Sequence, residues 1–304
     1  MIDTLDLAKL DARDVAELAR LRRAVSDVGF LRVSNTGLDK ARIEAVLAAY
    51  KAFFRLPEAQ KSRVDMAKTG ANRGWGAPQS EQVDPDANPD YKEVFDCGFE
   101  LPEDSAYADR GLSVYAPNQW PDAPSGFQHM VQGYYDDGCA VAMRILRAIA
   151  VALGRDAGSI DAAFDTPMAL LRGNFYPQRP VWAGARDFGI GAHTDYGCLT
   201  LLATDGTPGL EAQLPDGSWA EVQAAPGTFV INFGEMLEFW TAGQVKATMH
   251  RVVGGADERV SVPLFFNPSY DTNVAPPESD QVISAGEHLT RRFNETYVHL
   301  KTAS

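Results

Sequence analysis

Short apolar runs separated by turn signals are the feature that most constrains the fold of this chain. Between about residues 168 and 267 such runs alternate with DGTPG, LPDGS and APG, whose Gly, Pro and Asp residues favour turns. Short strands at this spacing are typical of antiparallel sheets that close on themselves or stack in two layers. The sequence therefore predicts a mainly β core.

Helical patterns flank this core. Apolar residues recur at helical spacing in DARDVAELARLRRAVSDVG and LDKARIEAVLAAYKAFFRL, which enclose the extended segment FLRVSN, and again in GFQHMVQGYYDDGCAVAMRILRAIAVALG. Residues 67–124 are rich in Pro, Gly, Asn and Asp and predict long loops over a pocket. We expect one domain over 1–304, with a helical and loop region at 1–124, the core with the site at 168–267, and a C-terminal helix at 286–301.

Composition narrows the classes of partner. The formal net charge is −13 and no basic cluster occurs, which argues against nucleic acid or an anionic membrane as partner. No twenty-residue apolar run and no basic leader is present, so we expect a cytoplasmic protein acting on a small molecule. The three cysteines are widely spaced and are interpreted as reduced thiols: Cys97, Cys139 and Cys198. The sequence leaves the oligomeric state open and is compatible with a monomer.

Two histidines and one aspartate are the strongest candidates for metal ligands. His193 and Asp195 stand two residues apart, and His250 follows about fifty-five residues later. Two imidazoles and one carboxylate form the three-ligand face of non-haem Fe(II) oxygenases. If AHTDYGCLTLLAT is one extended strand, His193 and Asp195 point to the same side. The other histidines lie in helix-like sequence and are expected at the surface or at helix ends: His129, His288 and His299.

A second pair of residues predicts a carboxylate-binding site. Arg259 and Ser261 stand two residues apart in RVSVPLFFNP, which reads as a strand, so their side chains share one face. A guanidinium binds a carboxylate through a planar fork, and a serine hydroxyl adds a third hydrogen bond.

These motifs together resemble a known family. From about residue 15 to residue 300 the chain is similar to the isopenicillin N synthase-like branch of the Fe(II)/2-oxoglutarate-dependent dioxygenases. The matching segments occur in family order: DVGFLRVSNTG, NRGWGAPQSE, DYKEVFDCG, LRGNFYP, GAHTDYGCLTLL, ATMHRVV and ERVSVPLFFNP. The resemblance implies a double-stranded β-helix, or jelly roll, with helices outside. It also implies an EC 1.14.11-type dioxygenase that uses Fe(II), 2-oxoglutarate and O2, with ascorbate stimulating turnover in vitro.

The resemblance implies a reaction and assigns residues to it. An unactivated C–H bond of a small metabolite would be oxidised, by default hydroxylated, with release of succinate and CO2; desaturation and cyclisation stay open. His193, Asp195 and His250 would bind the iron. Arg259 and Ser261 would bind the distal carboxylate of 2-oxoglutarate. Two residues of LRGNFYP would help: the Tyr176 hydroxyl at that carboxylate and Asn174 near the chelating end.

Four further residues are candidates for substrate contacts. Arg172 lies two residues before Asn174, so on a strand it shares the inward face. It would hold a substrate carboxylate or the 1-carboxylate of 2-oxoglutarate, or else pair with a structural acid. Trp75, Glu93 and Phe95 come from segments that match the family's substrate mouth, although Glu93 could equally pair with Lys92 or Arg73. Arg172 and Glu93 point to a substrate with a carboxylate or an amine.

Three alternatives remain at this stage. An iron oxidase of the same fold could keep the three ligands and an Arg-x-Ser pair without using 2-oxoglutarate, as in isopenicillin N synthase-like ring closure; Asn174 and Tyr176 favour 2-oxoglutarate. A zinc hydrolase can use the same ligands but has no need of a carboxylate fork. A non-catalytic jelly-roll binding protein has no need of the three ligands.

Overall fold

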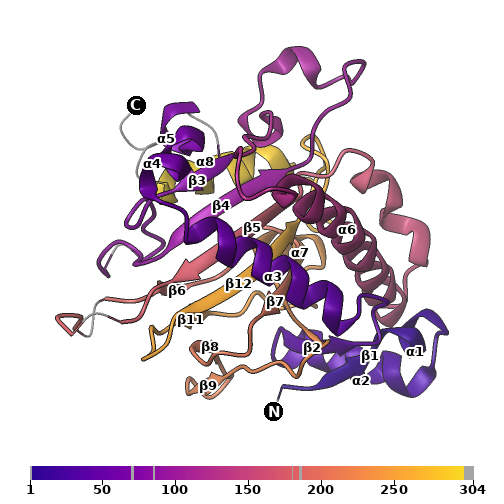
Figure 1. The fold of residues 1–304 in the computed structure, drawn as a ribbon. Helices are drawn as coiled ribbons and strands as arrows, with labels where there is room; N and C mark the ends of the chain where they lie inside the picture. Colours follow the sequence, from indigo (N-terminus) through magenta and orange to yellow (C-terminus); the bar gives the residue numbers. More distant parts are fainter. Residues whose placement is uncertain (1, 70–71, 85, 180, 185–186, 298–304) are drawn as a thin grey trace.

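The computed structural model describes residues 2–69, 72–84, 86–179, 181–184 and 187–297 (Figure 1). Its strands form two sheets. The larger, eight-stranded sheet has the order β1-β2-β10-β7-β12-β5-β4-β3, with bounds Thr4–Asp6, Phe30–Ser34, Phe229–Phe233, Leu199–Thr204, Arg259–Phe266, Leu170–Tyr176, Glu93–Gly98 and Gly74–Gly76. The smaller has the order β6-β11-β8-β9, with bounds Ile190–His193, His250–Val252, Leu210–Gln213 and Trp219–Glu221. Apart from the parallel pair β1 and β2, neighbouring strands are antiparallel.

The helices lie outside the sheets. Their bounds are Leu7–Asp11 (α1), Val15–Asp27 (α2), Lys40–Phe54 (α3), Glu58–Lys61 (α4), Met66–Thr69 (α5), Phe127–Ala152 (α6), Glu235–Trp240 (α7) and Ala285–Thr296 (α8). Helices α3 and α6 cross one face of the large sheet and contact β12 and β7 (Figure 1). No helix of the described residues has both the length and the apolar character needed to span a bilayer.

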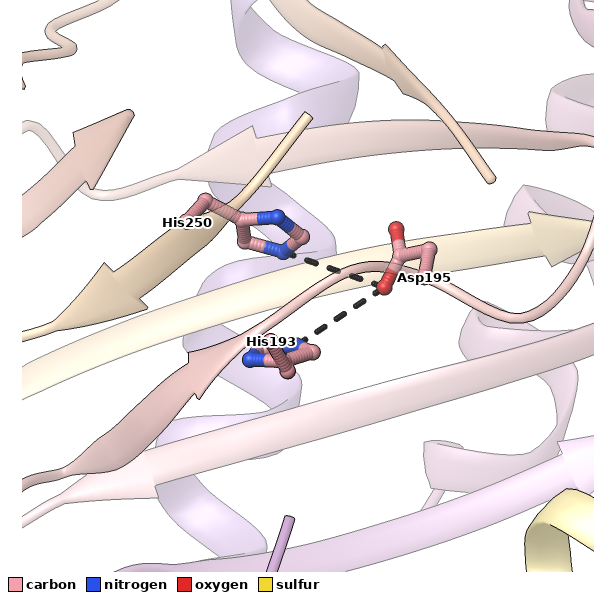
Figure 2. Close-up of side chains that lie close together, drawn as sticks. All are labelled: His193, Asp195 and His250. Atoms are coloured by element: carbon pink, nitrogen blue, oxygen red, sulfur yellow. Dashed lines mark ion pairs between the residues drawn. The ribbon is translucent and has the colours of Figure 1, made fainter. Parts of the chain in front are cut away.

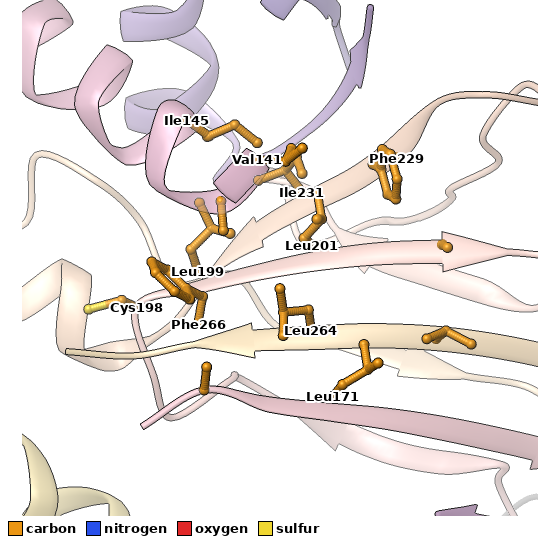
Figure 3. Packing of buried hydrophobic residues seen from close by; sticks show 14 of the residues in the cluster. Val141, Ile145, Leu171, Cys198, Leu199, Leu201, Phe229, Ile231, Leu264 and Phe266 are labelled. Atoms are coloured by element: carbon orange, nitrogen blue, oxygen red, sulfur yellow. The ribbon is translucent and has the colours of Figure 1, made fainter. Parts of the chain in front are cut away.

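Strand β12 shows how the large sheet separates a core from a site. Val262 and Leu264 belong to the apolar cluster that packs against α6, as Figure 3 shows for Leu264, Val141 and Ile145. Ser261 and Phe265, on the opposite face, line a cavity. Because both faces are buried, the strand appears in the sequence as a nearly continuous apolar run.

The predicted mainly β core with outer helices is confirmed, and the predicted helices lie where expected. Asp14 accepts a hydrogen bond from the Glu17 amide and so caps α2, and Asp39 caps α3 in the same way through the Arg42 amide. The long helix α6 ends before Gly154, whose φ of +79° suits glycine.

The N-terminal region differs from its prediction as a region of helices and loops with one strand. It contributes β1 and β2 to one end of the large sheet, and β3 and β4 to the other end. Strand β4 pairs with β5 from Glu93 opposite Phe175 to Gly98 opposite Leu170. The sheet therefore extends beyond the predicted core of 168–267. The C-terminal helix ends at Thr296, and residues 298–301 of its predicted range lie outside the described residues.

Candidate metal centre and adjoining cavities

The three candidate metal ligands converge from three segments of the chain. His193 ends β6 and lies opposite His250, the first residue of the neighbouring strand β11. Asp195 lies in the link between β6 and β7. Nε2 of each imidazole is 3.8 Å from Oδ1 of Asp195, and one ligand atom from each residue lies within 4.8 Å of the others (Figure 2). The side chains thus surround a site of ion size.

One geometric expectation was wrong, although the convergence was predicted. His193 and Asp195 do not lie on one continuous strand, because β6 belongs to the small sheet and β7 to the large sheet. The chain crosses between the sheets at residues 194–198, where a Cβ on Gly197 would lie 1.8 Å from Oδ1 of Asn267. The same oxygen accepts a 2.9 Å hydrogen bond from the Cys198 amide. Close packing around Gly197 therefore fixes the path of residues 194–198, and this path determines where Asp195 lies.

Hydrogen bonds to main-chain oxygens orient both imidazoles. Nδ1 of His193 lies 2.8 Å from the Gly191 oxygen, and Nδ1 of His250 lies 3.0 Å from the Thr248 oxygen. A carbonyl oxygen only accepts, so each Nδ1 carries the proton and each Nε2 offers its lone pair to the site.

Asp195 presents one oxygen to the site. Its Oδ2 accepts hydrogen bonds from Oγ1 of Thr200 and, at 2.6 Å, from Nδ2 of Asn232, while Oδ1 faces the imidazoles. Burial raises the pKa of the Asp195 carboxyl, but the two imidazoles and these two hydrogen bonds outweigh it and lower that pKa below the ordinary value. Asp195 is therefore an anion within a buried site.

His193 is held in its neutral form. Burial, followed by the charge of His250, lowers the pKa of His193 to about 3. A neutral imidazole is the form that binds a metal. Two imidazoles and one carboxylate, with the remaining side open to a cavity, fit the donor set of a non-haem Fe(II) site.

A first cavity adjoins the metal site and contains the residues predicted to bind a carboxylate. Arg259 lies opposite Tyr176, and Ser261 opposite Asn174, on the paired strands β12 and β5. Nη1 of Arg259 donates to Oγ of Ser261 at 3.2 Å, and the guanidinium carbon is 5.0 Å from the Tyr176 ring centroid. Among the described residues no acid lies within ion-pair distance of Arg259, which is 3% exposed. A buried cation without an acid leaves its charge available to a ligand.

The comparisons with known proteins agree with this site. Residues 167–268 match the model of the 2OG-Fe(II) oxygenase superfamily, and residues 2–123 match the model described as non-haem dioxygenase in morphine synthesis N-terminal. The chain belongs to the 2OG-Fe(II) oxygenase superfamily. It is a 2-oxoglutarate-dependent dioxygenase that binds iron through the His193, Asp195 and His250 triad.

Relatives cover nearly the whole chain. A 2-oxoglutarate-dependent dioxygenase of Penicillium crustosum, traH, is 34% identical over 97% of this chain and 93% of its own length. A homoarginine-6-hydroxylase of Glycine max is 31% identical over 97% and 95%, respectively.

Solved structures share the fold. A full-length Neurospora crassa protein in complex with alpha-KG and thymine superposes with a TM-score of 0.82 at 27% identity, over 97% of this chain and 96% of the other. A putative oxygenase of Caulobacter crescentus gives a TM-score of 0.82 at 29% identity, over 97% and 98%. The predicted family and the jelly-roll fold are therefore confirmed.

A second cavity of this dioxygenase meets the first at the metal site, since His193 and Asp195 line both. Its outer walls come from the two ends of the chain. Residues of the N-terminal loops and of the C-terminal segment contribute to them: Asn72, Arg73, Val83, Val114, Leu289, Phe293 and Tyr297. The sequence did not single out these residues, because loop residues follow no periodic pattern. The three C-terminal residues do follow one, since Leu289, Phe293 and Tyr297 recur every four residues, as on one side of a helix.

Arg172 lines both cavities, but its guanidinium is occupied by acids. Nε and Nη2 donate to the two carboxylate oxygens of Asp96 at 2.8 and 2.6 Å, and Nη1 donates to Glu81 at 3.0 Å. Asp96 is its direct neighbour on β4. Of the roles expected for Arg172, the geometry supports a partner for structural acids and does not support an anchor for a substrate carboxylate.

Glu93, Phe95 and Trp75 line neither cavity in the described part of the chain, so their expected role as pocket residues is corrected. Glu93 pairs with Lys61 and accepts a 2.7 Å hydrogen bond from Nε1 of Trp75. Phe95 packs in an aromatic cluster, 4.8 Å from the Phe53 ring. Asp96, the next residue on β4, instead reaches Arg172. The wrong face of a strand buried on both sides was assigned to the pocket.

His288 also departs from its expected position. It is 4% exposed, on the buried side of α8 beside Glu235, whereas His129 lies exposed on α6 as predicted. His299 lies outside the described residues.

Proposed function

We propose that this dioxygenase hydroxylates a C–H bond of a small, uncharged polar molecule and oxidises 2-oxoglutarate to succinate and CO2 in the same cycle. One oxygen atom of O2 enters succinate and the other enters the product, so the reaction balances. The observation that carries the proposal is the buried Arg259, which lines the first cavity and has no acid partner among the described residues.

The first cavity suits 2-oxoglutarate because its polar groups lie at two ends. Arg259, Ser261 and Tyr176 would bind the distal carboxylate, since a guanidinium and two hydroxyls supply several donors to one anion. Asn174 lies two residues before Tyr176 on β5, and its Oδ1 is buried without a partner among the described residues. We place the chelating end of the ligand near Asn174 and the triad.

When bound, Fe(II) supplies the redox chemistry that couples oxidation of the 2-oxo acid to oxidation of the substrate. The chain's own residues do the rest. His193 and His250 offer Nε2 atoms that hydrogen bonds at Nδ1 hold in place, and Asp195 offers one anionic oxygen. Phe265 and Arg172 line both cavities and would lie between the two bound ligands.

The charges of the second cavity favour an uncharged substrate. Apart from the metal ligands, the charged side chains that line it in the described residues are Arg73, Glu81 and Arg172. Glu81 and Arg172 are paired with each other. The terminal nitrogens of Arg73 donate to the main-chain oxygens of Asn72 and Val114 at 2.8 and 2.7 Å. The charge of the buried Asp96 carboxylate already acts on Arg73, so a charged substrate would lose its hydration without gaining a counter-charge that is not shared with a residue of the protein. In support, the similar Neurospora crassa protein is in complex with thymine, which is uncharged.

The competing functions have less support. An iron oxidase that dispenses with 2-oxoglutarate leaves the buried cation of Arg259 without a counter-ion. A zinc hydrolase and a non-catalytic binding protein are excluded by the family and the enzyme class.

Succinate release tests the proposal directly. The purified protein with Fe(II), 2-oxoglutarate and ascorbate should consume O2 and form succinate slowly, and an accepted substrate should accelerate both. A panel matched for size should contain neutral amides and heterocycles, amines and carboxylates. Oxygen consumption independent of 2-oxoglutarate would identify the oxidase instead. Acceleration confined to amines or to carboxylates would refute the substrate class and leave the cosubstrate assignment intact.

A further inference from the structure

Helix α8 presents two adjacent stripes of residues to two different parts of the molecule. Leu289, Phe293 and Tyr297, at its end, line the second cavity. His288, Arg292 and Thr296 contact the segment around Asp195 and the start of α7, and Thr296 also lines the second cavity. Each stripe repeats every four residues, which places its members on one side of a helix. One helix thus contacts both the second cavity and the segment that carries a metal ligand.

Glu235 links α8 to the residue before Asp195. Its Oε1 accepts hydrogen bonds from Nη2 of Arg292 at 3.1 Å and from Oγ1 of Thr194 at 2.9 Å. Its Oε2 lies 3.4 Å from Nε2 of His288. Glu235 and Arg292 retain only 20% and 30% exposure of their side chains, so solvent weakens this pair less than it weakens a surface pair.

The residue after Asp195 is held by the same helix. The Tyr196 main-chain oxygen lies 3.1 Å from Nε2 of His288, and its hydroxyl lies 2.5 Å from Oγ1 of Thr296. The Arg292 guanidinium is stacked 4.3 Å from the centroid of the Tyr196 ring. Tyr196 therefore contacts α8 directly, and Thr194 is linked to α8 through Glu235.

The main chain of Asp195 is fixed from the α7 side. The Glu235 amide donates to the Asp195 oxygen at 2.9 Å, and a Cβ on Gly234 would lie 2.5 Å from that oxygen. Glu235 therefore contacts the main chain of Asp195 through its amide and α8 through its carboxylate.

We propose that Arg292 and Glu235 are positioning residues, which fix residues 194–196 against α8 and so set the position of Oδ1 of Asp195. Thr194, Glu235 and Arg292 form a chain of contacts from the ligand segment to the helix that borders the second cavity. The inference rests on the triad as the metal site.

Cobalt(II) titration of the metal-free protein, followed by visible absorption, tests the proposal without turnover. Arg292→Gln should weaken the apparent Co(II) affinity about tenfold, the lower end of the effect of groups that orient metal ligands, and should alter the ligand-field spectrum. Arg292→Lys should recover much of the affinity because it keeps the cation. Glu295→Gln is the matched control, since Glu295 is an exposed partner of Nη1 of Arg292 and, in the part of the chain that the structure describes, does not hydrogen-bond to Glu235.

Thr194→Val supplies a second variant that keeps side-chain shape and removes only the hydroxyl that donates to Glu235. It should alter the Co(II) spectrum in the same direction as Arg292→Gln even if the latter fails to fold. An unaltered spectrum and affinity in folded Thr194→Val would overturn the proposal, as would an equal loss in Glu295→Gln. Failure of the wild-type protein to bind Co(II) would instead refute the triad on which the proposal rests.

Discussion

Nδ2 of Asn232 donates a 2.6 Å hydrogen bond to Oδ2 of Asp195, the carboxylate oxygen that faces away from the two imidazoles. Thr200 donates to the same oxygen from the neighbouring strand. These two donors leave Oδ1 as the oxygen directed at His193 and His250. The orientation of the carboxylate of the triad is therefore set by two side chains outside the triad.

We expect Asn232→Leu, which is close in shape, to lower metal affinity by about 10- to 100-fold, because it removes a donor that orients Asp195. Asp195→Ala should abolish measurable Fe(II) binding in a protein that remains folded. Titration with Fe(II) under anaerobic conditions, with circular dichroism to verify folding, measures both. Wild-type affinity in Asn232→Leu would show that Thr200 alone fixes the carboxylate, and wild-type affinity in Asp195→Ala would refute the triad.

Arg259→Lys should reduce the apparent affinity for 2-oxoglutarate by at least about tenfold, or about 1.4 kcal/mol, because an ammonium keeps the charge but loses the fork. Metal binding should be preserved, since Arg259 makes no contact with the triad in the structure. Titration of 2-oxoglutarate into the Co(II)-loaded protein measures the first quantity, and Co(II) titration without it measures the second. An unchanged 2-oxoglutarate titration would place the distal carboxylate elsewhere.

Arg172→Met should destabilise the fold by about 3 to 5 kcal/mol, because it leaves the buried carboxylates of Asp96 and Glu81 without their shared cation. Urea unfolding at pH 7 measures this change. Arg63→Met is the control, because its partner Asp122 is 87% exposed and such pairs contribute about 0 to 1 kcal/mol. A stable Arg172→Met protein that lost only substrate binding would restore Arg172 as a substrate anchor.

The effect of Glu81→Gln should depend on pH. Burial raises the pKa of Glu81, but the charges of Arg172 and Lys92 outweigh it and bring that pKa to about 2. A carboxyl whose pKa is lower in the folded state stabilises the fold above its unfolded pKa, and this contribution disappears as pH falls towards the folded value. Wild type should therefore exceed Glu81→Gln in unfolding free energy by about 3 kcal/mol at pH 7. Urea unfolding between pH 7 and 3.5 should show a constant difference down to about pH 4.5 and a smaller one below. If the difference in unfolding free energy between wild type and Glu81→Gln increased as the pH fell, Glu81 would not have a lowered pKa in the folded protein.

Gly234→Ala should disrupt the metal site through the backbone. The added methyl group would lie 2.4 Å from the Gly197 oxygen and 2.5 Å from the Asp195 oxygen, neither of which is a flexible side-chain end. We expect loss of stability together with weaker Co(II) binding. Gly158→Ala is the control, since its methyl group would meet only Oδ2 of Asp161 at 3.7 Å. Equal Co(II) affinity in the two variants would contradict a role for this close approach.

The metal ligands and the candidate cosubstrate residues could be predicted because their chemistry is local. His193 and Asp195 are separated by one residue, as are Arg259 and Ser261, so the backbone alone brings each pair close together. His250 followed from the rarity of histidine in the chain. Even so, the continuous strand through Asp195 was wrong, because contacts of Gly197 with Asn267, seventy residues away, end the strand.

The substrate side could not be predicted, because its residues are selected by tertiary packing. On β4 both Phe95 and Asp96 are fully buried, and only the pairing with β5 shows that Asp96 reaches the cavity wall while Phe95 enters the core. Likewise, nothing local links Glu81 to Tyr297, which the fold brings into an isolated bridge. The structural role of Arg172 could not be predicted either, because its partners Asp96 and Glu81 lie more than seventy residues away in the sequence.

The outer walls of the second cavity come from the two ends of the chain, whereas the iron ligands lie within residues 167–268. Substitutions in these walls, at Asn72, Val114 or Phe293, alter the shape offered to a substrate without replacing a ligand of the metal. Selection for a new substrate can thus act on the chain termini while the oxidising centre is inherited unchanged.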